Sequence, residues 1–216
     1  MSLITLKNIK KQYGKDQVLF ENLSLEIEKG EFVGLVGKSG AGKTTLLNII
    51  GLITDISAGT ITIDGHQNVS INSKNAMILR RYTIGYLFQN YGLIEDESVL
   101  WNLKLALEYK KIKKKEKLKL IDKYLKQFEL TDMLDKKVYQ LSGGEQQRIA
   151  IIKLILQGSR IILADEPTSG LDKENESIVM KLLKELNEDG ITIIMVTHNM
   201  NLLDCFSRVI NVENFR

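Results

Sequence analysis

The chain has 216 residues, of which 30 are Lys or Arg and 27 are Asp or Glu, so its formal net charge is +3. Apolar residues make up 44% and charged residues 26%, which is the balance of an ordinary globular protein and excludes a collagen-like or disordered chain. The length is ample for a packed core of one or two domains.

The cysteine content excludes an internal disulfide and a cysteine-based metal cluster, because Cys205 is the single cysteine. We expect Cys205 to be a small buried apolar residue. The most apolar mid-chain run, residues 149–152, is interrupted by Lys153 and falls short of the roughly 20 residues of a spanning helix. Residues 1–7 alternate like a strand and lack the order of a signal peptide. Any work at a membrane is therefore expected of a peripheral subunit.

Strand patterns recur along the chain. Residues 23–27 alternate apolar and polar side chains, as a half-buried strand does. Residues 32–36 form a continuous apolar run that ends at Gly37, which is typical of a buried parallel strand. The turn pair Asp64-Gly65 closes a further strand. The predicted strands are 1–7, 23–27, 32–36, 60–63, 84–88, 161–164, 191–196 and 209–212.

Helical patterns lie between these strands, at 44–50, about 99–128, 142–157 and 173–187. Strands that alternate with helices predict an α/β fold with a mainly parallel sheet. Residues 91–157 have no strand pattern, so we interpret them as a helical lobe. The predicted organisation is a single domain, with residues 1–90 and 158–216 as the α/β core and 91–157 as the inserted lobe.

A lysine run, residues 110–117, holds six lysines and one glutamate. We interpret it as a solvated helix face or loop in preference to a nucleic-acid or lipid site, because it has no interleaved aromatic residues. We expect no nucleic-acid partner.

A phosphate-binding loop is predicted between the buried strand 32–36 and the helix 44–50. The pattern G-x-x-x-x-G-K-[ST] is met by Gly37, Lys38, Ser39, Gly40, Ala41, Gly42, Lys43 and Thr44. Glycines let backbone N–H groups point at a phosphate chain, and the helix N-terminus adds its positive dipole end. In such a loop Lys43 reaches the β- and γ-phosphates and the Thr44 hydroxyl binds Mg²⁺. The alternative is a plain glycine turn.

Two carboxylates, Asp165 and Glu166, follow the apolar strand 161–164. Strand ends of parallel sheets are where open α/β folds place ligands. Asp165 suits a role at Mg²⁺, and Glu166 suits a general base toward an attacking water. The plainer alternative is a solvated turn.

A capped helix start is predicted at residues 141–148, Leu-Ser-Gly-Gly-Glu-Gln-Gln-Arg. Ser142 and Glu145 fit the capping box S-x-x-E. Capping does not require Gly143 and Gly144, which weaken a first turn. They suit a backbone that approaches an anion, so this helix start is a second candidate phosphate site.

In this order, these segments make the chain similar to the nucleotide-binding subunits of the ABC transporter family, over essentially the whole length. Residues 37–44 match the Walker A motif, 161–166 the Walker B motif, and 141–145 the LSGGQ signature, with Glu145 for the final Gln. Gln89 matches the Q-loop and residues 169–172, ending at Asp172, match the D-loop. His198 matches the switch histidine, and Tyr13 stands where the family has an aromatic residue that stacks on adenine.

The resemblance implies a P-loop NTPase (RecA-like) core with an N-terminal antiparallel β subdomain and an inserted α-helical subdomain. It also implies ATP and Mg²⁺ as cofactors and an ATPase activity. The expected catalytic residues are Glu166, His198, Gln89 and Lys43, and the expected metal ligands are Thr44, Gln89 and Asp165. The expected nucleotide-binding residues are Tyr13, Gly37, Lys38, Ser39, Gly40, Ala41, Gly42, Lys43, Thr44, Thr45, Ser142, Gly143, Gly144, Glu145 and Asp172.

Each minor motif also has a plainer explanation. Tyr13 suits strand packing, Gln89 a surface amide, and His198 a structural histidine. Asp172 is a natural N-cap for the helix that follows it, and we expect it to be that as well. The sequence departs from the family after residue 151, where Ile152-Lys153-Leu154 replaces the usual Ala-Arg-Ala.

The partners follow from the same resemblance. Two subunits are expected to pack head to tail, as a homodimer or with a sister chain, so that Ser142, Gly143 and Gly144 of one bind the γ-phosphate held by the other. An integral membrane subunit is expected to dock on the Q-loop and helical-lobe groove, about residues 86–105. Tyr91 and Trp101 are either contacts there or, as we favour, packed into the lobe. The chain is expected to be peripheral, at the cytoplasmic face of the cell membrane.

Three functions stay open. Residues 86–96 resemble ATPases of small bacterial peptide and bacteriocin exporters and of the macrolide and lipoprotein-extraction type, which favours export of a peptide or amphiphile. The second is a non-transport ATPase that drives a membrane partner mechanically, in cell-wall or signalling regulation. The third, a soluble ATPase of DNA repair or translation, is weak, because the chain has neither a long insertion between the Walker motifs nor a second cassette.

Overall fold

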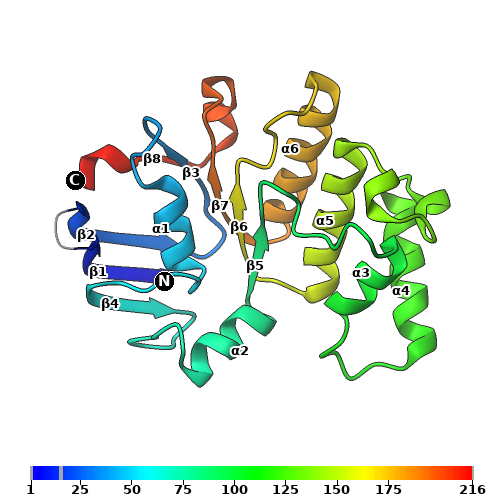
Figure 1. Cartoon of the computed structure of the whole chain (residues 1–216), viewed down its shortest axis with the longest axis horizontal. Helices are drawn as coiled ribbons and strands as arrows, with labels where there is room; N and C mark the ends of the chain where they lie inside the picture. Colours follow the sequence, from blue (N-terminus) through cyan, green and yellow to red (C-terminus); the bar gives the residue numbers. More distant parts are fainter. Residues whose placement is uncertain (1, 15–16, 216) are drawn as a thin grey trace.

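Two sheets organise the fold, which the computed structural model describes for residues 2–14 and 17–215. The antiparallel sheet has the order β2-β1-β4, formed by Gln17–Glu28, Ser2–Tyr13 and Ala58–Ile63. The parallel sheet has the order β5-β6-β7-β3-β8, formed by Ile84–Leu87, Ile161–Asp165, Thr192–Val196, Phe32–Val36 and Arg208–Asn211. The antiparallel sheet lies at one end of the molecule and the parallel sheet in the middle (Figure 1).

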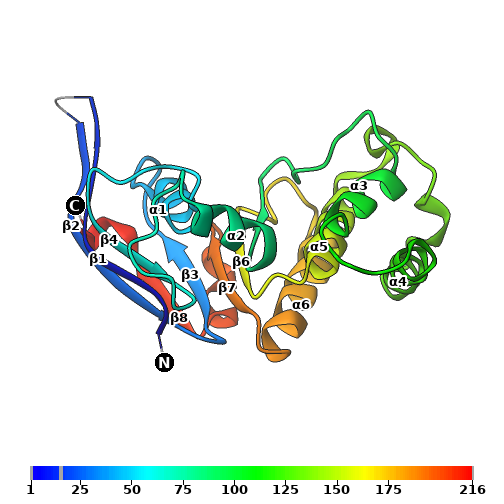
Figure 2. The same ribbon diagram turned by 90° about the horizontal axis from the view of Figure 1, so that it is seen from below.

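The helices are α1 Lys43–Ile50, α2 Lys74–Tyr82, α3 Val99–Ala106, α4 Lys114–Gln127, α5 Gly143–Gln157 and α6 Lys173–Glu188. Short 3-10 turns are η1 Thr131–Met133, η2 Val138–Gln140, η3 Met200–Cys205 and η4 Val212–Phe215. Helices α3 and α4 form the end of the molecule opposite the antiparallel sheet (Figure 2). Among residues 2–14 and 17–215, no helix combines the length and apolar character needed to cross a bilayer.

The parallel sheet separates two hydrophobic clusters. Leu163 and Ile194 belong to the cluster that includes α1 and the antiparallel strands. Their neighbours Ile162 and Ile193 belong to the other, which includes α5 and α6 and extends into α3 and α4. Successive side chains of a strand point to opposite faces, so a strand covered on both faces is apolar at every position. The predicted α/β class with its antiparallel N-terminal sheet and added helices is confirmed.

The predicted strands are confirmed, with changed bounds. The first is longer than expected and runs to Tyr13, while Met1 lies outside the described residues. The turn after β4 is a tight hairpin in which Asp64 and Gly65 both have positive φ and Ile63 exchanges hydrogen bonds of 2.9 and 3.0 Å with His66.

The expectation of one helical stretch over residues 99–128 is wrong. The helix stops at Leu107, and α4 restarts after Lys113, whose N–H donates to the Glu116 carboxylate at 3.1 Å. The break holds the first three lysines of the run, whereas the later ones lie on α4. Helix α2 was not predicted, although Ser73 caps it by accepting from Ala76 N–H at 3.1 Å.

Two burial expectations are also wrong. Cys205 is exposed at the end of η3 rather than buried. Trp101 is 39% exposed rather than packed into the lobe, since it lies on the outer side of α3. Tyr91 is half-buried and packs against the second cluster, as expected.

The loop before α3 is held by one buried amide. Asn102 is fully buried and accepts from Ile94 N–H at 2.8 Å. Its amide nitrogen donates to the carbonyl oxygens of Ile94 and Ser98, both at 3.1 Å. Three hydrogen bonds thus fix the segment that follows Gln89 to the start of α3.

We expect Asn102→Ala to lower the free energy of unfolding by about 2–3 kcal/mol, because it removes three hydrogen bonds of a fully buried side chain and leaves the Ile94 N–H without this partner. A urea titration followed by circular dichroism measures this. The exposed Asn72 is the matched control, and Asn72→Ala should change stability by less than about 0.5 kcal/mol. Equal stability of the two variants would contradict the role given to Asn102.

Candidate functional site

The glycine loop between β3 and α1 has a backbone that side chains disfavour. Gly37, Gly40 and Gly42 have φ of 140°, 75° and 99°, in the left-handed region that glycine tolerates. A Cβ on Gly42 would also lie 2.8 Å from the Phe20 ring. Strand β3 is buried at all five positions, so the loop is attached to the most protected part of the sheet.

Lys43 lies across this loop. Its side chain is nearly buried, and its ammonium donates to the carbonyl oxygens of Gly37 at 2.8 Å and Lys38 at 3.0 Å. Burial lowers the pKa of the Lys43 ammonium, while nearby carboxylates, Glu166 first among them, act in the opposite direction. A cation with neutral hydrogen-bond partners is stabilised by an anion placed beside it.

Thr44 and Asp165 meet at the end of β6. The Thr44 hydroxyl donates to Asp165 Oδ1 at 3.2 Å. Burial raises the pKa of the Asp165 carboxyl, and the hydrogen bond from Thr44 opposes that rise. Gln89 lines the same cavity as Thr44 and Asp165. Hydroxyl, carboxylate and amide oxygens are the donors that Mg²⁺ prefers. Within the described residues, no group of three or more His, Cys, Asp or Glu side chains could hold a metal ion.

Glu166 and His198 form a pair on the other side of the loop. Glu166 Oε1 lies 2.9 Å from His198 Nε2. The backbone of Glu166 has φ of 48°, and its N–H donates to the Val196 carbonyl at 3.2 Å. A non-glycine residue in the left-handed region is strained, and such residues cluster at functional sites. The strain turns the Glu166 side chain out of β6 toward the end of β7, where His198 follows.

Lys43, Thr44, Glu166 and His198 share one cavity of about 320 Å³, whereas Asp165 and Gln89 line a second one that Thr44 also borders. The wall of the first cavity includes Tyr13, at the end of β1, whose hydroxyl lies 3.5 Å from Thr45 Oγ1. The Tyr13 ring is 44% exposed, and the Lys11 ammonium lies 4.6 Å from its centroid. Gly37, Lys38 and Ala41, which were also predicted to bind nucleotide, belong to the loop but do not line this cavity. The full lining is Tyr13, Gln17, Leu19, Ser39, Gly40, Gly42, Lys43, Thr44, Thr45, Glu166 and His198.

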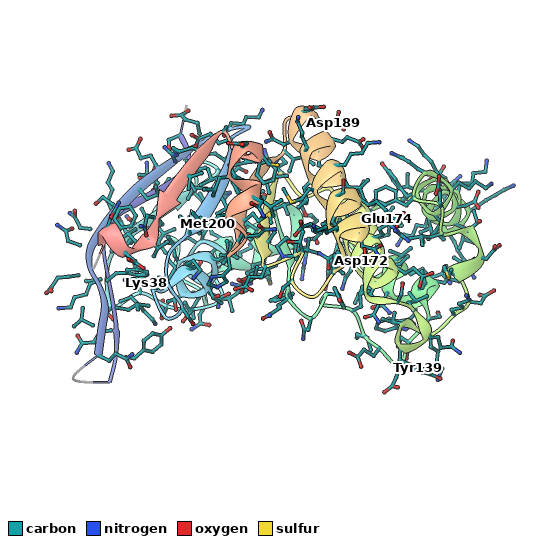
Figure 3. All side chains as sticks on the ribbon, turned by 90° about the horizontal axis from the view of Figure 1, so that it is seen from above. Lys38, Tyr139, Asp172, Glu174, Asp189 and Met200 are labelled. Atoms are coloured by element: carbon teal, nitrogen blue, oxygen red, sulfur yellow. The ribbon has the colours of Figure 1, made fainter. Side chains whose placement is uncertain are left out.

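The remaining predicted residues do not join this cavity. Ser142 caps α5, and its N–H and hydroxyl both donate to Glu145 Oε2 at 2.7 Å, which confirms the capping box. Asp172 caps α6 by accepting from Asn175 N–H at 2.8 Å. Lys38, in the glycine loop, lies well away from Asp172 along the long axis of the molecule (Figure 3). Within one chain, the two candidate phosphate sites are therefore separate.

The glycines of the signature have a packing reason that the sequence did not reveal. A Cβ on Gly144 would lie 2.1 Å from Asn175 Oδ1, and one on Gly143 would lie 2.9 Å from the Tyr91 hydroxyl. Asn175 Nδ2 also donates to Asp172 Oδ2 at 2.9 Å. Close approach of α6 to α5 therefore requires Gly144, whatever the helix start binds.

Three residues at the site were missed from the sequence. Gln17 and Leu19 of β2 also line the cavity, and Gln17 is the cross-strand neighbour of Tyr13. Glu213 of η4 accepts from Lys38 N–H at 2.7 Å. The pairing of β1 with β2 was the signal for Gln17 and Leu19, whereas no local pattern links Glu213 to a loop 175 residues earlier.

A family model described as ABC transporter matches residues 20–169. The macrolide export ATP-binding/permease protein MacB of Campylobacter jejuni is 42% identical over 212 residues, which are 98% of this chain and 33% of that protein. The chain thus spans about a third of the length of these curated relatives. An uncharacterised ABC transporter ATP-binding protein of Methanocaldococcus jannaschii is 40% identical over 98% of this chain and 96% of its own length.

Solved structures are also similar. The ATP-binding cassette MJ0796, in a dimeric post-hydrolysis state bound to ADP and Pi, aligns with a TM-score of 0.86 and 37% identity over 96% of this chain and 93% of that chain. The family match, the curated relatives and the similar solved structure agree. The chain, with its glycine loop, capped signature helix and carboxylate pair, belongs to the ABC transporter family of ATP-hydrolysing cassettes.

Proposed function

We propose that this chain binds and hydrolyses ATP in the cavity of the glycine loop and that hydrolysis drives a membrane partner. The observation that carries this is the meeting of Lys43, Glu166 and His198 in one cavity. Lys43 lies where it neutralises the β- and γ-phosphates, and Tyr13 offers its exposed ring to the adenine. Mg²⁺, when bound, neutralises charge on the phosphate oxygens, and Thr44, Asp165 and Gln89 are the residues proposed to hold it.

The proton transfer is assigned to Glu166. Its carboxylate accepts the proton of the attacking water, and His198, at 2.9 Å, keeps that carboxylate in place. The strained backbone of Glu166 supports this role, because it aims the side chain into the cavity rather than along β6. Gln89, at the rim shared with Thr44 and Asp165, is proposed to report the γ-phosphate to the partner-facing surface.

The site is proposed to be completed by a second copy or a sister chain. Ser142, Gly143 and Gly144 lie away from the loop cavity of their own chain, so they contact nucleotide only if they come from another chain. The dimeric state of the related cassette supports this arrangement. Loss of the γ-phosphate then removes a ligand shared by both chains, which opens the dimer.

The membrane partner is proposed to dock near Gln89, on the surface of residues 86–105. Phe88 is 39% exposed there and stacks on Tyr86 with ring centroids 4.1 Å apart. The proposed organisation is one domain, with an α/β core (1–90 and 158–216) and an inserted helical lobe (91–157). The similarity to proteins named macrolide export ATP-binding/permease supports export of an amphiphile or peptide, with the chain peripheral at the cytoplasmic face.

The first prediction concerns Glu166. Glu166→Gln should bind ATP with unchanged affinity and hydrolyse it at least about 100-fold more slowly, because the general base is lost. Phosphate release and nucleotide affinity, measured on the same preparation, separate chemistry from binding. Glu188→Gln, at the exposed end of α6, is the matched control and should behave as wild type. Wild-type turnover by Glu166→Gln would remove the residue from its role.

The second prediction concerns the shared site. Lys43→Met and Ser142→Arg should each be inactive alone, whereas an equal mixture should recover up to about a quarter of wild-type turnover, because half of the dimers are mixed and hold one intact site. Circular dichroism shows whether each variant is folded. A mixture as inactive as its components would contradict a site built from two chains.

The third prediction concerns the partner. Tagged Glu166→Gln protein, held with ATP and Mg²⁺ in mild detergent, should co-purify from native membranes with a stoichiometric polytopic membrane protein, identified by mass spectrometry. If only soluble proteins or nucleic acids co-purify, and the wild-type protein still hydrolyses ATP, the proposed coupling to a membrane partner is wrong. The proposed ATPase activity would then stand alone.

A further inference from the structure

Positive charge in this chain is concentrated on one segment. Residues 104–126 carry ten lysines against three acidic residues, while the rest of the chain carries 20 basic and 24 acidic residues. A chain of net charge +3 therefore consists of a strongly basic segment on a mildly acidic body. The segment comprises the end of α3, the break at residues 107–113 and most of α4.

The lysines of this segment are largely unpaired. Within the described ranges 2–14 and 17–215, the one ion pair they form is Lys126 with Asp122, at 2.8 Å. Lys111, Lys114, Lys115 and Lys119 are exposed. Nitrogen-tipped side chains project outward from the α4 end of the molecule (Figure 3). A solvated helix face that only aids solubility typically carries both signs of charge in similar numbers, whereas here the basic residues outnumber the acidic ones ten to three.

Exposed apolar side chains accompany these lysines. Trp101 and Leu105 lie one helical turn apart on α3 and are 39% and 43% exposed. Tyr109, in the break, is 55% exposed, and Leu118, on α4, is 38% exposed. The sequence run itself has no interleaved aromatic residue, but Tyr109 directly precedes it, and Leu118 lies one helical turn from Lys114 and Lys115 on α4. Lysine with an exposed Tyr is a composition that proteins place at a membrane–water interface.

A groove beside Tyr109 is also lined by cationic and aromatic side chains. It has a volume of about 340 Å³ and lies between α2 and α3. Tyr82 and Tyr109 meet edge to face with centroids 6.5 Å apart, and Arg81 lies 3.7 Å from the centroid of Tyr109. Every charged residue that lines it is a cation, namely Arg80, Arg81, Lys110 and Lys153. Burial lowers the pKa of Lys110 and of Lys153, so an anion beside either ammonium is stabilising.

We propose that this surface, the lysines of residues 110–119 with Tyr109 and Leu118, binds the anionic headgroups of a lipid bilayer. The lysines attract phosphates, and the aromatic and leucine side chains insert at the headgroup level. The nucleotide cavity lies toward the opposite end of the molecule, so it stays accessible when the surface is occupied. The lipid contact extends the proposed function, which already places the chain beside a membrane.

The test is co-sedimentation of the purified full chain with vesicles. Binding should be strong to phosphatidylcholine vesicles with about 30% phosphatidylglycerol and weak to phosphatidylcholine alone, and it should fall as salt is raised from about 0.1 to 0.5 M. Replacing Lys111, Lys114, Lys115 and Lys119 with Gln should lower the partition coefficient at least about tenfold, since each lysine near an anionic leaflet contributes several-fold.

The matched control replaces Lys7, Lys29, Lys181 and Lys184 with Gln, which makes the same change in net charge on other exposed positions. It should bind vesicles as wild type does. An equal loss in both variants, or equal binding to neutral vesicles, overturns the proposal. Binding to RNA as tight as to anionic vesicles at equal phosphate concentration also overturns it and makes the surface a nucleic-acid site.

ATP turnover, measured on the same preparations, separates this inference from the proposed function. Both four-lysine variants should hydrolyse ATP as wild type does, because none of the eight lysines lines the nucleotide cavity. Vesicle binding that fails while turnover is intact removes the lipid contact alone. If the wild-type chain binds vesicles but does not hydrolyse ATP, only the proposed ATPase activity is wrong.

Discussion

The site depends on the order of three neighbouring strands, β6, β7 and β3. They are parallel and in register, so that Asp165 pairs with Val196 and Leu35 with the same residue. Their carboxyl ends therefore lie at one edge of the sheet, which is where open parallel sheets bind ligands. The glycine loop follows β3, the carboxylate pair ends β6, and His198 follows β7. This arrangement brings Lys43, Glu166 and His198 to a common cavity.

Two separate requirements explain the pair of glycines at the start of the signature helix. Close packing of Asn175 against Gly144 holds α5 to α6, and the same bare helix start is free to approach an anion. Asp172, which caps α6, is bonded to the same Asn175. The signature and the D-loop are thus one rigid unit. A displacement of α5 moves both of the elements that the proposal assigns to the neighbouring chain's nucleotide.

Local features of the fold were predictable from the sequence, and features that depend on distant residues were not. The glycine loop, the carboxylate pair and the cap at Ser142 are each specified within about ten residues, and the structure has all of them. The prediction of a continuous helix over residues 99–128 failed, because the break at residues 107–113 contains no Gly or Pro to mark it. The exposure of Cys205 and Trp101 depends on which face of a short element meets the core. The contact of Glu213 with Lys38 spans 175 residues and left no local pattern.

The position of β3 in the sheet has a consequence for the order of folding. Its two neighbours, β7 and β8, come from residues 192–196 and 208–211, so β3 gains neither partner until almost the whole chain has been made. Contacts of such large sequence separation form late, because loop closure must precede them. During synthesis the apolar run at residues 32–36 is an unpaired strand, the kind of segment on which chaperones act. The strand that holds the phosphate loop is therefore among the first made and among the last to be fixed.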